Sequence, residues 1–578
     1  MMKFKFLPFA LALLMLGACS NDNEFEKEGT VQTGEQGYVS MSINLPSLKG
    51  SRSVEYNDGT PEEYDVKEAK LLIFSNITED EATAVCQGIY NLDISAFLGN
   101  DEEQITSTAQ IVQEITKPEE ANLYALVVLN DNGLITDDYK SKTFSEFYTA
   151  VQTLDVAKLN GNGFFMTNAP LSSKIGGTQD PTGAEVTTLA KIDANKIYRT
   201  EREALNSPAT TVYVERALSK VTLEGASTTQ TPSTGANPNI ASYIINGWTL
   251  DNTNKSTFLV RNVTGISNWL AYNADNKGYR FVDGQAVETG VSLYRTHFGI
   301  DPNYSGAYTP SEQFHMVDKI PASLAAADGK TPIYCLENTF DVAGMKDINT
   351  TRAIVAATLN IKGAEDGGDF YLLNNNTNVI YQYEGVINEV KRLWMLKFET
   401  IASEHIKSGT FTADNVIVSL SNAEDEPQND GGFTTVTKLE MTAPADVIYQ
   451  EGKSLENINA AAQDYMNMLN GGLLTIAYYK SGVAYYEVLI KHFGDETPWE
   501  APGTGTDSYP GRDESTKWLG RYGVLRNTWY ALEVIGLKNI GSPEVPDVTE
   551  KWDDQSEQYI SVEINILPWA KRSQRVEL

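Results

Sequence analysis

Cysteine, histidine and basic residues are all scarce in this 578-residue chain, which has three Cys, four His and 45 Lys+Arg against 77 Asp+Glu. No histidine has an i, i+4 histidine partner or a neighbouring cysteine pair, so a zinc site is not indicated. Cys86 and Cys335 lie far apart in the sequence; their spacing leaves a disulfide open, and we expect two separate buried thiols. The net charge of −32 repels phosphate backbones, and we expect no nucleic-acid partner.

Motifs for catalysis are also missing. The Gly-Lys-Thr at Gly329–Thr331 and the Gly-Lys-Ser at Gly452–Ser454 lack the upstream glycine that a phosphate-binding loop needs. There is no G-x-S-x-G elbow for a serine nucleophile, and the acidic loops lack EF-hand spacing. We therefore expect no enzyme activity, no cofactor and no metal.

Long apolar runs are absent except at the start of the chain. Lys3 and Lys5 precede the apolar run Phe6–Leu16, which is too short to span a bilayer and is typical of a secretory signal. Leu16-Gly17-Ala18-Cys19 resembles a lipobox, which predicts a signal peptide over residues 1–18 and lipidation at Cys19. An ordinary signal peptide with an incidental cysteine is the alternative. The polar, acidic residues 20–37 are typical of a disordered tether.

What the chain does have is β-patterning. Tyr (29) and Phe (20) are plentiful, and short runs of Val, Ile, Thr and Tyr alternate with Gly/Asn/Asp/Pro-rich loops. The pattern predicts a mainly β protein with a few short helices, at Thr143–Leu154 and within Asn457–Leu469. Ser227–Asn239 is rich in Thr, Pro, Gly and Asn, which indicates a loop or linker near a domain boundary.

Two matching strands lie near the ends of the chain. In Tyr38–Leu45 the apolar residues recur at every second position, and the same period recurs near the C-terminus. The first set is Val39, Met41, Ile43 and Leu45, and the second set is Ile560, Val562, Ile564 and Ile566. Lys49 and Arg52 follow the first strand in a small, flexible segment, where a trypsin-type protease would find access.

Seven stretches resemble blocks of Bacteroidetes fimbrillins, and the nearest resemblance is to the shaft subunit of the minor fimbrium, a type V pilin. These stretches are Gly163–Pro170, Val214–Val221, Gly247–Asn254, Asp301–Tyr304, Tyr334–Phe340, Leu519–Tyr530 and Ile566–Gln574. The resemblance runs from the lipobox to the last residues.

The resemblance implies two transthyretin-like β-sandwich domains, expected here over residues 53–226 and 227–578. It implies export as a lipoprotein to the outer membrane, followed by assembly into a cell-surface fimbria that supports adhesion and biofilm formation. A trypsin-like Arg/Lys protease would remove the lipidated propeptide, residues 19–52, together with its strand. We expect the cut at Arg52, with Lys49 as the alternative.

The vacated groove would then accept the C-terminal strand, residues 559–578, of another copy. Anchor and tip subunits, and receptors on host or bacterial surfaces, are the further partners that the resemblance implies. Two other functions stay open: a tip adhesin of the same family, and a monomeric surface lipoprotein that binds glycans. A tip subunit often carries an additional adhesive module, for which a two-domain length leaves limited room.

Overall fold

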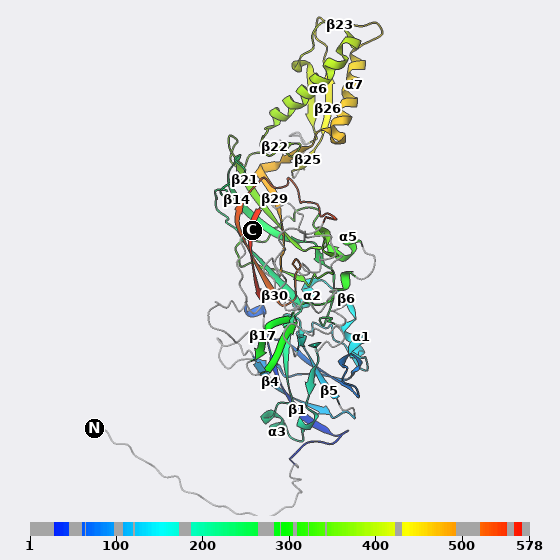
Figure 1. Cartoon of the computed structure of the whole chain (residues 1–578), viewed down its shortest axis with the longest axis vertical. Helices are drawn as coiled ribbons and strands as arrows, with labels where there is room; N and C mark the ends of the chain where they lie inside the picture. Colours follow the sequence, from blue (N-terminus) through cyan, green and yellow to red (C-terminus); the bar gives the residue numbers. More distant parts are fainter. Residues whose placement is uncertain are drawn as a thin grey trace, which may run out of the picture.

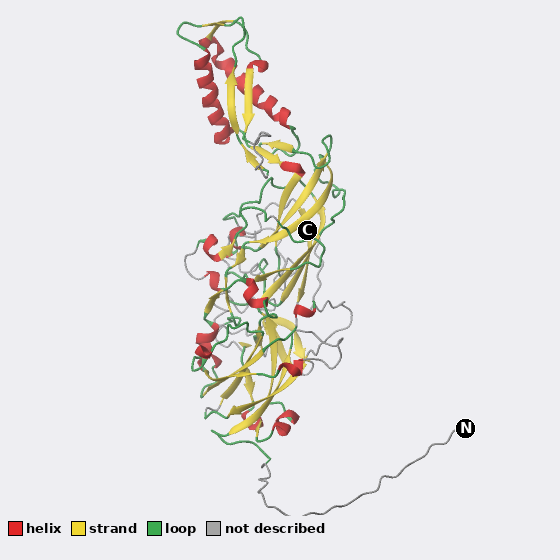
Figure 2. Ribbon diagram, turned by 180° about the vertical axis from the view of Figure 1, so that it is seen from behind, coloured by secondary structure: helices red, strands yellow, loops and turns green. Residues whose placement is uncertain are grey.

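The computed structural model describes residues 28–45, 60–63, 65–97, 108–119, 122–172, 186–263, 282–288, 291–296, 298–304, 309–321, 323–341, 344–421, 431–492, 521–551 and 560–568. The described part is mainly β, as the sequence predicts, and it is elongated (Figures 1 and 2). Cys19, Lys49 and Arg52 lie outside the described residues.

The first body is built on a sheet with the strand order β11-β1-β12-β7-β5-β2-β3, in which β4 also pairs with β1 and β10 with β5. Its strands are β1 (Gln36–Asn44), β2 (Ala69–Asn76), β3 (Val85–Asn91), β4 (Thr108–Thr116), β5 (Asn122–Leu129), β7 (Met166–Asn168), β10 (Ala190–Ile192), β11 (Ile197–Tyr198) and β12 (Thr210–Arg216). β5 is buried along almost its whole length, as expected of a strand covered on both faces.

The second body has two sheets that share one apolar core. One sheet has the order β20-β13-β30-β31 and the other the order β14-β21-β29. The strands are β13 (Leu218–Glu224), β14 (Ile240–Asp251), β20 (Ile333–Leu336), β21 (Arg352–Ile361), β29 (Val483–Leu489), β30 (Thr528–Leu537) and β31 (Ile560–Pro568). β12 belongs to the sheet of the first body and β13 to a sheet of the second body, and Ala217 lies between these two strands.

A third apolar core lies at the end of the molecule where the long helices are (Figures 1 and 2). Its elements are α6 (Tyr383–His405), β24 (Val416–Leu420), β26 (Val436–Met441) and α7 (Leu455–Met468). They fall between β22 (Phe370–Leu373) and β28 (Ile476–Tyr479), which pair with each other; β25 (Gly432–Thr434) also pairs with β28. We refer to residues 375–474 as the distal module.

The helices differ from expectation in two places. The helix predicted over Thr143–Leu154 ends early: α1 covers Phe144–Tyr148, and β6 (Val151–Thr153) instead pairs with β16 (Ser256–Phe258). A partner strand about 100 residues away thus overrides the local helical pattern. α6 has 23 residues, longer than the short helices expected, although its apolar residues Val386, Val390, Trp394 and Phe398 follow a helical period.

Both internal cysteines are free and buried, which confirms the expectation of separate thiols. Cys86 belongs to the first core and Cys335 to the second. Burial raises the pKa of Cys86 to about 11 and that of Cys335 to about 12, so neither is a reactive thiolate at neutral pH.

Among the residues that the structure describes, no helix combines the length and apolar character needed to span a bilayer. The same residues contain no cluster of three His, Cys, Asp or Glu side chains with metal-binding geometry.

Candidate functional site

β1 lies inside its sheet, with partners along both edges. On one edge β4 runs antiparallel to it over the whole length, from Gln36↔Thr116 to Asn44↔Thr108. On the other edge β1 pairs antiparallel with β11 and then parallel with β12, where Met41 lies opposite Thr210. The backbone N–H and C=O groups of β1 are thus satisfied in two directions, and so are the facing groups of its neighbours.

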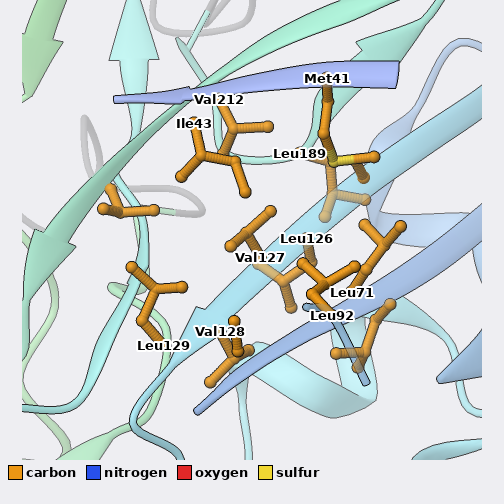
Figure 3. Packing of buried hydrophobic residues seen from close by; sticks show 14 of the residues in the cluster. Met41, Ile43, Leu71, Leu92, Leu126, Val127, Val128, Leu129, Leu189 and Val212 are labelled. Carbon is orange, nitrogen blue, oxygen red and sulfur yellow. The ribbon is translucent and has the colours of Figure 1, made fainter. Parts of the chain in front are cut away.

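One face of β1 is a row of buried aliphatic side chains. Val39, Met41 and Ile43 are completely buried, and Leu45 is buried just beyond the end of the strand. Figure 3 shows Met41 and Ile43 close to Val212 and Leu189, with β5 beneath them. At ~1.5–3 kcal/mol for each side chain, the row contributes roughly 6–12 kcal/mol of gross burial energy. The alternation in the sequence therefore corresponds to one packed face.

The opposite face of β1 is covered as well. Ser40 is completely buried, and its carbonyl accepts the Ala209 N–H at 2.7 Å. The Gln110 side chain of β4 donates to Ser40 Oγ at 3.2 Å and to the carbonyl of Leu205 in α3 (Glu201–Asn206). A short helix and a polar contact thus cover the side of β1 that faces away from the apolar row.

The residues directly before β1 are packed, although the composition of residues 20–37 predicts a disordered tether. Val31 is buried, and its N–H donates to the Ile197 carbonyl at 3.0 Å. Glu35 forms an ion pair with Arg199 at 2.7 Å, and the Gly29 N–H donates to Glu203 at 2.8 Å. The sequence-based prediction is therefore wrong for residues 28–35, because α3 and β11 supply partners that composition alone does not show.

The C-terminal strand β31 lies at an edge of its sheet. It pairs antiparallel with β30, from Leu537↔Ile560 to Thr528↔Pro568, and the described residues contain no second strand beside it. Ile560, Val562, Ile564 and Ile566 lie opposite Leu537, Val534, Leu532 and Tyr530. β31 therefore has one hydrogen-bonded neighbour where β1 has partners on both edges.

Buried charges connect the first and second bodies. Arg261 contacts Glu215 of β12 at 3.1 Å and Glu337 at 3.6 Å, and Arg526 contacts Glu337 at 3.0 Å. All four side chains are almost completely buried. Burial raises the pKa of Glu215, while the neighbouring guanidinium groups of Arg261 and Arg526 oppose that shift. Arg295 acts on Glu215 in the same direction, so several guanidinium groups stabilise the charged form of this buried carboxylate.

A second ion pair lies at the same junction. Glu63 contacts Lys220 of β13 at 2.7 Å and accepts a hydrogen bond from the Tyr334 hydroxyl at 2.6 Å. The Lys220 ammonium also lies 4.1 Å from the centre of the Trp529 ring. Burial lowers the pKa of Lys220, and Glu63 counteracts this shift by stabilising the charged form. The same burial, together with Glu63, raises the pKa of Tyr334.

Six of the seven sequence stretches quoted above supply buried polar contacts at or near this junction. Asn168 bonds the backbone of β5, Asp301 accepts from Asn254, and Tyr304 donates to Asn338 at 2.7 Å. Asp251 binds Arg352 at 2.8 Å. The seventh stretch, Ile566–Gln574, lies mostly outside the described residues. These stretches therefore form structural contacts between strands.

Sequence reasoning missed Glu63 and Arg261, which belong to none of those stretches. Both are charged residues in loop-like sequence, where an exposed side chain is the ordinary expectation. Only the strands that the fold brings around them show that they are buried. No local signal marks either position.

The C-terminal part of the chain matches a known protein family. Residues 477–575, which include β29, β30 and β31, match the family described as major fimbrial subunit protein type IV, fimbrillin, C-terminal. No curated protein matches the chain.

Several solved structures are similar to the chain. A fimbrilin from Porphyromonas gingivalis is 11% identical, with 94% of this chain and 99% of that chain covered and a TM-score of 0.39. Two putative cell adhesion proteins from Parabacteroides distasonis are 12% and 10% identical, each with a TM-score of 0.36. They cover 93% and 95% of this chain and 100% and 99% of their own.

Replacing Arg526 with methionine is expected to destabilise the protein by about 3–5 kcal/mol, because Glu337 keeps a buried charge with one partner fewer. Denaturant unfolding, followed by circular dichroism, measures the change. Arg392→Met is the control, since Arg392 forms an exposed pair with Glu389 on α6 and its loss should cost less than about 1 kcal/mol. Equal losses in the two variants would contradict the structural role of the junction charges.

Proposed function

We propose that this chain is a fimbrillin: a subunit of a cell-surface fimbria that polymerises by exchange of a β-strand after proteolytic removal of β1. The proposal is carried by one observation, the position of β1 as a strand near the N-terminus that is paired on both edges and packed on its apolar face. The family match of residues 477–575 supports the assignment as a fimbrial or adhesion subunit.

Loss of β1 would leave an open groove. The edges of β4 and β12 that now bond to β1 would present unpaired N–H and C=O groups, and the apolar surface beneath Met41 and Ile43 would meet water. Such a groove binds an extended peptide strongly, because main-chain hydrogen bonds and alternate side chains are recovered together. The C-terminal segment of another copy, with Ile560, Val562, Ile564 and Ile566 at period two, is the proposed occupant.

The exchange is favourable for the donor strand as well. Among the described residues β31 pairs with β30 alone, whereas in the groove it would pair with strands on two sides. Before cleavage, β1 occupies the groove with the advantage of intramolecular effective concentration, which prevents premature assembly. Cleavage after Arg52, or after Lys49, ends that advantage because the released segment is diluted away.

Strand exchange of this kind would produce a filament. A donor in one part of the molecule and an acceptor in another make a heterologous contact, which propagates when its symmetry does not close a ring. In this proposal Cys19 carries the lipid that holds the precursor at the outer membrane until an Arg/Lys protease acts. The mature subunit then joins further copies of itself, with anchor and tip subunits at the ends and surface receptors as adhesion targets.

The distal module favours a second candidate, the tip adhesin. The module is inserted between β22 and β28, which pair with each other. Its apolar core is centred on Trp394, Phe398 and Tyr465 and extends into these two strands at the base of the module. It also carries exposed apolar side chains, among them Leu396, Ile417 and Met468. An inserted module of this kind provides a binding surface without changing the sheets below it.

Replacing both Lys49 and Arg52 with alanine is expected to leave the full-length lipoprotein and abolish fibres, because β1 is then never released. Immunoblotting of sheared surface material measures both outcomes. Lys27→Ala, a basic residue of the same propeptide, is the control and should assemble normally. Normal fibres from the double variant would refute cleavage at these sites, and a wild-type chain that keeps β1 would favour the monomeric glycan-binding lipoprotein.

Truncation before Tyr559 is expected to give folded monomers that do not form ladders after cleavage, because the proposed donor is missing. A chain truncated after Pro568 keeps the whole of β31 and serves as the control. Gel electrophoresis without heating distinguishes ladders from monomers. Ladders from the shorter chain would show that the donor lies elsewhere.

Replacing residues 375–474 by an Asn-Gly turn tests the second candidate. Because Asn374 and Thr475 already bond to each other across the base of the module, the two sheets of the second body should still fold. For a tip adhesin we expect a loss of adhesion to cells with unchanged strand exchange. Unchanged adhesion in the shortened chain would argue against the tip adhesin and for a shaft subunit.

A further inference from the structure

The segment that follows the proposed cleavage site contains a second potential site for the same protease. Lys67 is the next basic residue after Arg52, and its side chain is 48% exposed. A cut after Lys67 would separate residues 53–67 from the folded body just before β2. A protease with Arg/Lys specificity could therefore trim too far, unless the structure prevents it.

Glu63 holds this segment at the junction of the two bodies. Its side chain is completely buried, and its carboxylate contacts Lys220 and Tyr334, which lie on the paired strands β13 and β20. Its backbone carbonyl accepts a hydrogen bond from Arg216 Nε of β12 at 2.8 Å. Three strands thus fix the position of one residue that lies between the proposed cut and β2.

Asn130 holds the backbone next to Lys67 itself. It is completely buried at the end of β5, and its side-chain oxygen accepts the Lys67 N–H at 2.7 Å. Its side-chain nitrogen donates to the Asp65 carbonyl at 2.8 Å and to the Phe164 carbonyl at 3.0 Å. The Asn130 side-chain amide therefore hydrogen-bonds to the main-chain groups of Asp65 and Lys67, on both sides of Val66. These bonds would have to break before the segment could bind to a protease as an extended substrate.

We propose that Glu63 and Asn130 form a stop for proteolytic processing, which confines cleavage to the bonds before residue 60. The inference rests on the proposed function, because it assumes that an Arg/Lys protease trims the chain. Proteases cut segments that open locally, and burial and hydrogen bonding of the backbone determine how often a segment opens. The exposed Lys67 side chain is thus available to a protease while its main chain is not.

The stop also protects the junction. A cut after Lys67 would release Glu63 together with residues 53–67, and Lys220 would lose a buried partner. Lys220 is 3% exposed, so its charge could not be hydrated in place. Correct processing would then open the groove of β1 and leave the contact between the two bodies intact.

Limited trypsin digestion of the purified full chain tests the stop, with N-terminal sequencing and intact mass at each time point. The wild-type chain should give new N-termini at Gly50 and Ser53 and none at Glu68 while the body stays folded. Glu63→Ala and Asn130→Gly should each add a terminus at Glu68, at a rate increased by at least about tenfold, because each change removes buried hydrogen bonds. Glycine is used at position 130 because Asn130 has φ +52°.

Glu62→Ala is the matched control, since Glu62 is adjacent and exposed, and it should give the wild-type fragments. If thermal unfolding shows that the Glu63→Ala variant does not fold, Glu63→Gln replaces it in the digestion, because glutamine keeps the shape of the side chain. Adding Lys67→Ala to either variant should abolish the extra fragment.

A Glu68 terminus in the wild type at the rate of Ser53, or its absence from both variants, would overturn the stop. Absence of Gly50 and Ser53 from the wild type would contradict the proposed cleavage sites instead. The Glu68 terminus still tests the stop in that case.

Discussion

The structure depends on the satisfaction of backbone hydrogen bonds along both edges of β1. Removing a strand from the edge of a sheet breaks one ladder of backbone hydrogen bonds. Removing β1 would break two ladders, one with β4 and the other with β11 and β12. The buried row of Val39, Met41 and Ile43 couples those ladders to the first core. If a strand in this position leaves and no other strand replaces it, two rows of backbone groups lose their partners and the apolar core is exposed to water.

Buried charged side chains hold the junction between the first two bodies. Glu215, Arg261, Glu337 and Arg526 are buried there in contact with side chains of opposite charge, and Glu63 binds Lys220 close by. Paired buried charges contribute little net stability, but a single charge left behind is costly. The junction is therefore intolerant of partial opening.

The distal module shows how such a scaffold can acquire a new surface. The chain enters the module after β22 and leaves it before β28. Because β22 and β28 pair with each other, the two ends of the insertion lie side by side. On the outer edge of β26, the side chains of Asn459 and Asn470 bond the backbone of Met441 and Val436. Asn459 belongs to α7 and Asn470 to the π-helical turn Leu469–Leu473 directly after it, so both amides come from within the module and bond the backbone at the two ends of this strand edge.

The sequence by itself determined the β class of the protein and the two end strands, because period-two alternation is a local property. It also indicated α7, whose residues have high helix propensity. Only the tertiary structure decided that β1 is central and β31 peripheral, since the two strands have the same pattern and differ in their neighbours. The burial of Glu63 and Arg261, the strand at Val151–Thr153 and the core of the distal module were likewise decided by partners distant in the sequence. Pairing between such partners depends on the whole chain, and no short segment encodes it.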